Sequence, residues 1–346
     1  MNSINSISES HGTFRDFQDL LTSYRISCVL LIAHELGIFD ALEHGPGHAE
    51  DICRKTGMDR AYGLRFLDVL CHLGFLDKEN GFLGLSDFSK QFLIKTADSY
   101  QGDALVFEKK MVESWQNLSQ TLCQGKRVYN VMEKSPEEYR AALGLYLGAM
   151  DNVARIRAKE LWDRINPGQG GLILDAGAGS GAFLMEFLKR HPSWRGVFCD
   201  LPDVIHLALD NPEIKPFLNR LDFKAVNFLD DDQALESVRA DIVLCSNVVH
   251  CQGRDETQLI LSRLVPALAE QGLLLVHDFF IDAGYRGALY DLHMMLNTYN
   301  GRTYMTSDLC NMLSPLGLAH HKVLNLSSTS SALVFSKIPT NQGFFV

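Results

Sequence analysis

The stretch Leu172–Phe187 constrains the fold more than any other part of the sequence. A short apolar run ends in Asp175, a turn rich in glycine follows, and the next residues have the spacing of an amphipathic helix. In a strand–turn–helix of this kind the backbone approaches a bound nucleotide too closely for a β-carbon, so glycine is needed. The stretch therefore predicts a site for a cofactor that contains a nucleoside. The glycines of the turn are Gly177, Gly179 and Gly181.

The sequence after residue 166 alternates between strand-like apolar runs and helical stretches. This alternation predicts an α/β fold with a doubly wound, Rossmann-like sheet and right-handed crossovers. Ligands bind at the carboxyl ends of the strands in such sheets, so the residues that end each run are candidate site residues. The runs are Leu172–Asp175, Gly196–Asp200, Asp222–Asn227, Ile242–Ser246, Leu273–Asp278 and Ala332–Ser336.

The part of the chain before residue 166 has a mostly helical pattern. Two short helices, expected over 49–56 and 60–73, precede apolar runs on either side of Glu79-Asn80-Gly81, a turn sequence typical of hairpins. This order predicts a winged helix. Residues 48–90 contain six Lys or Arg against seven Asp or Glu, so the module has no basic face for DNA. The expected domains are a helical winged-helix domain (1–100), a helical connector (101–166) and a Rossmann-like domain (167–346).

The connector contains a clear start signal for a helix. Ser135 can cap the first turn, Pro136 suits the first helical position, and the acids Glu137 and Glu138 face the positive end of the helix dipole. A helix is therefore expected to begin at residue 136.

The composition is that of an ordinary folded protein and narrows the possible partners. The 346 residues carry 32 Lys and Arg against 42 Asp and Glu, a formal net charge of −10 that disfavours nucleic acid as a partner. The eight cysteines form no C-x-x-C pair, so we expect reduced thiols and no metal site. No leader and no apolar run of about 18 residues is found, so a cytoplasmic protein without a membrane partner is expected.

The glycine turn also matches the G-x-G-x-x-A pattern of nicotinamide-dependent oxidoreductases. Three features argue against that cofactor. Asp175 precedes the first glycine by two residues, where it can accept hydrogen bonds from turn amides or a cationic amino group. The glycines alternate, which gives an open turn suited to an amino-acid tail, and no second nucleotide-binding half follows. Asp200 suits ribose hydroxyls with either cofactor, because a carboxylate accepts two hydrogen bonds at once.

Four motifs occur in one order along the chain: Asp175–Gly181, Asp200–Ile205, Ser246–His250 and Gly272–Asp278. With them the chain resembles the S-adenosylmethionine-dependent O-methyltransferases of the plant caffeic-acid and bacterial polyketide-tailoring type. The resemblance covers nearly the whole chain, because that family also has an N-terminal winged-helix-like dimerisation domain. It implies S-adenosyl-L-methionine as cofactor, an intertwined homodimer through the N-terminal domain, and a role in secondary metabolism. The small-molecule acceptor would bind between the two domains.

A hydroxyl acceptor must lose a proton when it is methylated, and a phenol with a pKa of about 10 needs a base for that at neutral pH. His250 lies at the ligand edge of the predicted sheet, where an imidazole suits this role. Asp278 ends the next strand-like run, and a carboxylate beside the second ring nitrogen would fix the tautomer. In the family that this chain resembles, a histidine and an acid 28 residues later do this work, and 278 − 250 is 28.

The resemblance also assigns contacts with the cofactor and the acceptor, and the chain departs from the family's pattern at three positions. Cys251 stands where Asp usually follows the histidine, Thr303 stands where a second acid is expected, and Asn227 replaces the acid that meets the adenine amino group. The expected cofactor-binding residues are Asp175, Gly177, Gly179, Gly181, Asp200, Leu201, Asn227, Phe228 and Ser246. The expected acceptor-pocket residues are Tyr146, Met150 and Val153 in the connector, and Met294, Met295 and Asn297.

The apolar character of these pocket positions favours a flat aromatic or polyketide-like acceptor. Other functions remain open from the residues alone. The methyl group could go to carbon or nitrogen, with His250 only positioning the acceptor. A winged-helix protein could also sense S-adenosylmethionine without transferring its methyl group. A third alternative is a nicotinamide-dependent oxidoreductase, which would change the absorbance of the reduced nicotinamide when substrate is added.

Overall fold

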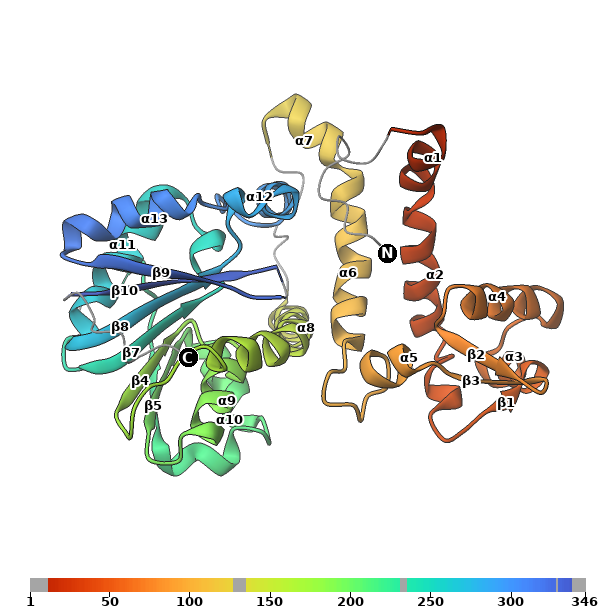
Figure 1. Ribbon diagram of the computed structural model, residues 1–346, viewed down its shortest axis with the longest axis horizontal. Helices are drawn as coiled ribbons and strands as arrows, with labels where there is room; N and C mark the ends of the chain where they lie inside the picture. The colour runs from red at the N-terminus through yellow and green to blue at the C-terminus, as the bar shows by residue number, and fades with distance from the viewer. Residues whose placement is uncertain (1–11, 127–134, 231–234, 328, 338–346) are drawn as a thin grey trace. The chain divides into compact units, whose positions relative to one another are not determined.

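The protein divides into two compact units, and the division falls between Val112 and Glu113. The computed structural model describes residues 12–126, 135–230, 235–327 and 329–337. Figure 1 labels the helices and strands of each unit. Within these described ranges, no helix is both long enough and apolar enough to cross a membrane.

The first unit is helical and contains one small antiparallel sheet of order β1-β3-β2. Asn80 and Gly81 form the loop between β2 and β3, and both have positive φ (50° and 83°), as a two-residue type I′ turn requires. The predicted hairpin is confirmed, with Glu79 at the end of a strand instead of in the loop. The elements are α1 (Phe14–Thr22), α2 (Tyr24–Glu35), η1 (Asp40–Leu42), β1 (Gly47–His48), α3 (Ala49–Thr56), α4 (Arg60–His72), β2 (Leu76–Glu79), β3 (Phe82–Leu85) and α5 (Asp87–Phe92).

A shared apolar core joins the two short helices to the hairpin. Ile52 on α3, Leu67 on α4 and Leu83 on β3 are almost fully buried in one cluster. Asp59 caps α4, because its Oδ1 accepts hydrogen bonds from two backbone N–H groups of the first turn at 2.9 and 3.1 Å. The local cap and the common core together produce the winged-helix arrangement.

The second unit is built on a seven-stranded sheet of order β6-β5-β4-β7-β8-β10-β9. Neighbours from β6 to β8 are parallel, whereas β10 is antiparallel to both β8 and β9. The predicted doubly wound sheet is confirmed, and its strand order reverses between β4 and β7, which is where such sheets bind ligands. The strands are β4 (Leu172–Ala176), β5 (Arg195–Asp200), β6 (Leu221–Ala225), β7 (Ala240–Ser246), β8 (Leu268–Asp278), β9 (Ala319–Asn325) and β10 (Ser331–Ser336).

Helices cover both faces of this sheet (Figure 1). Alternate residues of β7 explain why: Val243 packs in a core with α11 and α13, whereas Leu244 packs in a second core with α8, α9 and α10. Trp162 at the end of α8 donates a hydrogen bond from Nε1 to the carbonyl of Phe183 on α9 at 2.9 Å. The helices are α6 (Gly102–Gln116), which spans the division between the units, α7 (Leu118–Gln124), α8 (Pro136–Trp162), α9 (Ala182–Arg190), α10 (Pro202–Asp210), η2 (Lys215–Arg220), η3 (Val249–Cys251), α11 (Arg254–Leu264), η4 (Val265–Ala267), η5 (Ile281–Ala283), α12 (Tyr285–Asn297), α13 (Thr306–Leu313) and η6 (Ser314–Leu316).

The expected start of α8 is confirmed. The hydroxyl of Ser135 accepts a hydrogen bond from the Glu138 N–H at 3.2 Å, and the Glu138 carboxylate accepts one from the Ser135 N–H at 2.8 Å. Strand β9, in contrast, was not predicted. It is an edge strand that exposes most of its residues and includes His320, His321 and Lys322, so it has no apolar run to mark it.

Candidate active site

The glycine turn joins β4 to α9 at the carboxyl edge of the sheet. Gly177 and Gly179 have positive φ (78° and 57°), a conformation that strains any residue with a side chain. A β-carbon on Gly177 would lie 2.4 Å from Cγ2 of Val248, whereas one on Gly179 would meet only Cδ2 of Leu147 at 4.0 Å. Gly181 follows as the N-cap of α9. The turn is therefore packed against protein at Gly177 and open at Gly179, where a ligand can approach the backbone.

Asp175 lies near the end of β4 and is almost completely buried. Its Oδ1 has no hydrogen-bond partner among the residues that the structure describes. Burial raises the pKa of this carboxyl to about 8, and the nearby charge of Asp200 acts in the same direction, against a backbone N–H of Leu184. A buried acid with an unused oxygen is suited to a cationic group on a ligand.

Asp200 ends β5 beside the same turn. Its Oδ2 accepts a hydrogen bond from the Gly179 N–H at 2.7 Å, and its Oδ1 accepts one from the Leu201 N–H at 2.7 Å. Leu201 is exposed and is the N-cap of α10. The structure thus brings the glycine turn, Asp200 and Leu201 together, and each carboxylate oxygen keeps a lone pair for a ligand.

Three other residues that were expected to bind the cofactor make contacts within the protein. Asn227 is exposed after β6, and its Oδ1 accepts a hydrogen bond from a backbone N–H two residues later while its Nδ2 lies 2.5 Å from Asp230. Phe228 is buried in the core beside α11. The hydroxyl of Ser246, at the end of β7, lies 2.8 Å from Nδ1 of His277. The side chains of Asn227 and Ser246 are therefore already engaged.

His250 and Asp278 form a buried pair. Nδ1 of His250 lies 2.5 Å from Oδ1 of Asp278, and the His250 N–H donates to Oδ2 at 3.3 Å. His250 lies in η3 directly after β7, and Asp278 ends β8, the parallel neighbour of β7. Because parallel neighbours end at the same edge of the sheet, the topology brings the two side chains together.

The electrostatic surroundings favour the charged form of His250. Burial alone would lower the pKa of the imidazole, but the charge of Asp278, its hydrogen bond and the adjacent Cys251 outweigh burial and raise this pKa well above its ordinary value. The second nitrogen, Nε2, faces away from the acid and lies 3.4 Å from the hydroxyl of Tyr290. Asp278 therefore stabilises a proton on a ring whose other nitrogen faces the hydroxyl of Tyr290.

A row of aromatic side chains flanks this pair, and the sequence analysis did not identify it. Tyr290 on α12 meets the His250 ring edge-on, with centroids 5.2 Å apart, and stacks on Phe279 at 3.9 Å. His293 lies 5.6 Å from Tyr290, and its Nδ1 accepts a hydrogen bond from Nε1 of Trp115 at 3.3 Å. We call Trp115, His293, Tyr290 and Phe279 the aromatic row. The spacing of Tyr290 and His293 on one helix face was the available signal.

The residues expected to line the acceptor pocket lie on α8 and α12. Tyr146 is 40% exposed, whereas Met150 and Val153 further along α8 are half-buried. Burial of the phenol group raises the pKa of Tyr146, and the nearby Cys251 and Asp200 act in the same direction, which places the Tyr146 hydroxyl close to these two residues.

On α12, Met294 is buried and Met295 is half-buried, and Oδ1 of Asn297 accepts a hydrogen bond from the hydroxyl of Ser114 at 2.6 Å. Thr303 occupies the position where a second acid was expected. Its N–H and hydroxyl donate to Oδ1 of Asp291 at 2.7 and 3.2 Å. An acid, Asp291, is therefore present beside position 303, but it comes from α12 and not from position 303 itself.

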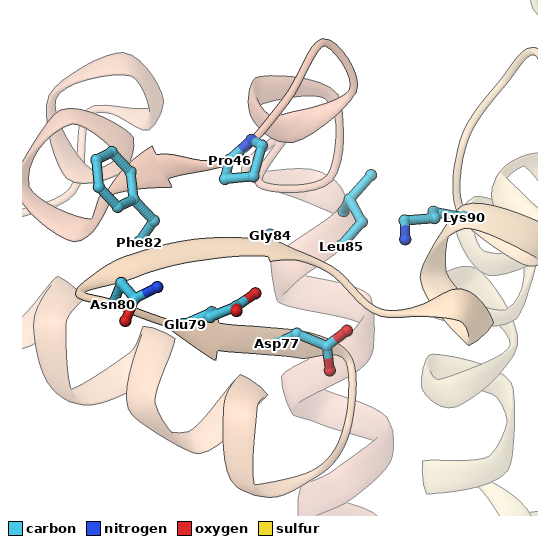
Figure 2. Close-up of a pocket in the computed structure, with 8 residues that line it drawn as sticks. All are labelled: Pro46, Asp77, Glu79, Asn80, Phe82, Gly84, Leu85 and Lys90. Carbon is cyan, nitrogen blue, oxygen red and sulfur yellow. The ribbon is translucent and has the colours of Figure 1, made fainter.

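A separate hollow lies on the first unit, beside the hairpin (Figure 2). It has a volume of about 630 Å³ and includes none of the expected site residues. Acidic side chains from β2 and a lysine from α5 surround an apolar patch there. The lining residues are Pro46, Asp77, Glu79, Asn80, Phe82, Gly84, Leu85 and Lys90.

Comparison with known protein families agrees with this fold. A family model of the O-methyltransferase domain matches residues 106–319, and a model of the O-methyltransferase dimerisation domain matches residues 18–95. The chain belongs to the O-methyltransferase family and carries the dimerisation domain of that family.

Individual relatives are distant but match over most of their length. The tetracenomycin polyketide synthesis 8-O-methyl transferase TcmO of Streptomyces glaucescens is 24% identical over 331 residues, which is 93% of this chain and 96% of the relative. The N,N-dimethyltransferase OxyT of Streptomyces rimosus is 27% identical over 277 residues, 78% of this chain and 79% of the relative. The structure of human N-acetylserotonin methyltransferase in complex with S-adenosylmethionine has the same fold, with a TM-score of 0.80, 20% identity, and coverage of 96% and 99% of the two chains.

Proposed function

We propose that the protein transfers the methyl group of S-adenosyl-L-methionine to a hydroxyl of a small aromatic or polyketide-like acceptor. His250 acts as the general base and Asp278 orients it. The observation that carries the proposal is the 2.5 Å contact between Nδ1 of His250 and Oδ1 of Asp278, which leaves Nε2 for the acceptor. The aromatic row beside Nε2 is a flat apolar wall that suits an aromatic ring.

The residues around the glycine turn fit the proposed cofactor. When bound, S-adenosylmethionine supplies a methyl group on a positively charged sulfur, which becomes a neutral thioether once the methyl is transferred. The unused Oδ1 of Asp175 suits the ammonium group of the amino-acid tail. The free lone pairs of Asp200 suit the ribose hydroxyls, and the open side of Gly179 leaves room for the ligand.

The chain's own residues then have to hold the acceptor oxygen in line and take its proton. Nε2 of His250 accepts the hydroxyl proton as the new oxygen–carbon bond forms and the sulfur–carbon bond breaks. Asp278 stabilises the resulting imidazolium through Nδ1. Tyr290 stays protonated, because burial first and the charge of Asp278 second raise the pKa of its phenol well above the ordinary value. Its hydroxyl can therefore orient the acceptor oxygen at Nε2.

Replacing His250 by Gln tests the base. We expect His250→Gln to bind S-adenosylhomocysteine within about twofold of the wild type, while turnover falls by on the order of 100-fold or more. Binding is measured by calorimetry, and turnover by transfer of a radiolabelled methyl group to a panel of phenols, hydroxyquinones and indoles. His206→Gln, at an exposed position of α10, is the control for loss of an imidazole. Unchanged turnover in His250→Gln would disprove the assignment.

Transfer to nitrogen is the second candidate, and the similarity to OxyT, named as an N,N-dimethyltransferase, favours it. An amine acceptor is already nucleophilic when neutral, so His250 would only position it. Mass spectrometry of the methylated product separates the two candidates, and a His250→Gln variant with most of its activity on an amine acceptor would favour nitrogen.

We also propose that a second copy of the chain covers the apolar side of α1 and α2. Among the described residues of the first unit, Phe14, Phe17, Leu21 and Tyr24 are all more than half exposed, and no residue of α1 is buried. Exposed apolar side chains at this density are typical of protein interfaces. The matched dimerisation model over residues 18–95 supports a homodimer through this unit.

A further inference from the structure

The face of α8 that carries the expected pocket residues continues to Arg157. Tyr146, Met150, Val153 and Arg157 are spaced by four, three and four residues, which places them on one side of the helix. The guanidinium carbon of Arg157 lies 4.6 Å from the ring centroid of Phe279. Because Phe279 is the end of the aromatic row, Arg157 stands at the end of that row, next to the strand end that carries Asp278.

The guanidinium of Arg157 has no polar partner within the described part of the chain. Its Nε is buried without a hydrogen-bond partner, and no hydrogen bond or ion pair of the described residues includes this side chain. Arg155, two residues earlier on the same helix, is different: its Nε lies 2.5 Å from Asp151, and Nη1 lies 3.7 Å from Glu213. The Arg157 side chain therefore lacks a partner because of where it lies on α8, since an arginine two residues earlier on the same helix is paired.

The acids near Arg157 are already committed to other groups. Asp278 binds His250, and Glu160, one turn further along α8, accepts a hydrogen bond from the hydroxyl of Ser327. Burial lowers the pKa of Arg157, against the charges of Asp278 and Glu160, but a guanidinium remains charged at neutral pH. Arg157 as a whole is half-buried, and its buried Nε is an N–H donor without a partner, which is costly unless an acceptor such as an anionic group binds it.

We propose that Arg157 binds an anionic group, a carboxylate, of the acceptor, and that the acceptor is a hydroxylated aromatic acid. This inference rests on the proposed function and narrows it to one substrate class. The aromatic ring lies along the aromatic row with its hydroxyl at Nε2 of His250, and its carboxylate meets the planar fork of Arg157.

The amino-acid tail of the cofactor also has a carboxylate, and the topology argues against it as the partner. The cofactor residues Asp175 and Asp200 end β4 and β5, whereas Arg157 lies at the end of β8. Strand β8 is two positions from β4 and three from β5, which corresponds to about 10 and 14 Å across the sheet. Arg157 is therefore on the acceptor side of the site.

Calorimetry on the full chain saturated with S-adenosylhomocysteine tests this assignment. The probes are a panel of hydroxynaphthoic acids and the matched carboxamides, which keep the ring and the hydroxyl but lose the charge. We expect the wild type to bind at least one acid about 10- to 100-fold more tightly than its amide. Arg157→Met should lose the preference for the acid, while its affinity for the amide stays within about twofold of that of the wild type. Arg157→Lys should keep part of the preference for the acid. Arg155→Met removes the same charge from the same helix and should leave the preference unchanged.

Each other outcome has a distinct meaning. The inference would be overturned if Arg157→Met lost affinity for the acid and for the amide to the same extent. It would also be overturned if the wild type bound the acids no more tightly than the amides. A lower affinity of Arg157→Met for S-adenosylhomocysteine alone would assign the guanidinium to the carboxylate of the cofactor instead. A wild type that fails to bind S-adenosylhomocysteine would contradict the proposed function itself. The midpoint of thermal unfolding separates binding from stability: we expect Arg157→Met to be at least as stable as the wild type, and a clear decrease would indicate a structural role.

Discussion

At the scale of single residues, the proposed role of His250 as general base predicts how the reaction depends on pH. Asp278 raises the pKa of the imidazole well above its ordinary value against the effect of burial, and only the neutral ring can accept a proton. Activity should therefore rise with pH through that raised pKa. In Asp278→Asn the imidazolium loses its partner, so the pKa falls and the rising limb moves to lower pH, while the plateau drops by on the order of 100-fold. The profile of kcat/KM against pH measures both effects.

The control for this profile is Asp282→Asn, which removes an exposed carboxylate that binds the Thr306 hydroxyl at 2.6 Å. Its rising limb should coincide with that of the wild type. If the rise of kcat/KM with pH occurred at the same pH in Asp278→Asn as in the wild type, the proposed role of Asp278 would be contradicted.

The buried carboxyl of Asp175 should release a proton when a cationic ligand binds beside it. With a pKa of about 8, this carboxyl is mostly protonated at pH 7 in the free protein, and an approaching ammonium group favours its ionised form. Binding of S-adenosylhomocysteine at pH 7 should release about one proton, because a group whose pKa falls on binding loses its proton. Calorimetry in buffers of different ionisation enthalpy measures this number. Asp175→Asn should release none, and equal binding enthalpies in all buffers for the wild type would show that Asp175 does not titrate.

Site residues at strand ends could be predicted from the sequence, whereas site residues within helices could not. His250 and Asp278 follow neighbouring strands, so the rule that strand ends share an edge was enough to suggest the pair. Arg157 and Tyr290 lie within helices and not at strand ends, so the same rule does not apply to them. Their places depend on how α8 and α12 pack on the sheet, and helical periodicity does not reveal that packing.

At the scale of elements, the turn between β4 and α9 combines two different constraints. Gly177→Ala places a β-carbon 2.4 Å from Val248 at positive φ and should lower the free energy of unfolding by about 2 to 4 kcal/mol. Gly179→Ala has space for its β-carbon and should cost only about 1 kcal/mol, yet it fills the open side of the turn and should weaken S-adenosylhomocysteine binding by more than 10-fold. Urea unfolding and calorimetry test the two effects. Equal stability of the two variants would contradict this division.

The elements themselves were predictable where their local signals were strong. The capping residues of α8 and the Asn-Gly loop of the hairpin marked their positions correctly. Strand β9 lacked such a signal because an edge strand that is largely exposed needs no apolar run. Its pairing with β10 is a tertiary contact, and a local sequence pattern does not contain it.

At the scale of the whole molecule, the exposed side of α1 and α2 predicts association. The double variant Phe17→Glu with Leu21→Glu introduces two charges among residues that are 58% and 62% exposed. If a second copy covers this side, the wild type should sediment as two chains and the variant as one, because burying unpaired carboxylates is costly. Leu209→Glu, at an exposed apolar position of α10 in the second unit, should sediment like the wild type. A wild type that sediments as a single chain would disprove the dimer.

The position of β10 has a consequence for synthesis of the protein. Strand β8 carries Asp278, and its outer neighbour is β10, which spans Ser331–Ser336 and is synthesised much later than Asp278. A nascent chain on the ribosome therefore contains the glycine turn, His250 and Asp278 long before β8 has a partner on that side. A prematurely released chain has an open strand edge, which favours aggregation and recognition by chaperones and proteases. Asp278 therefore lies in a sheet with strands on both sides only after the chain has been synthesised as far as Ser336.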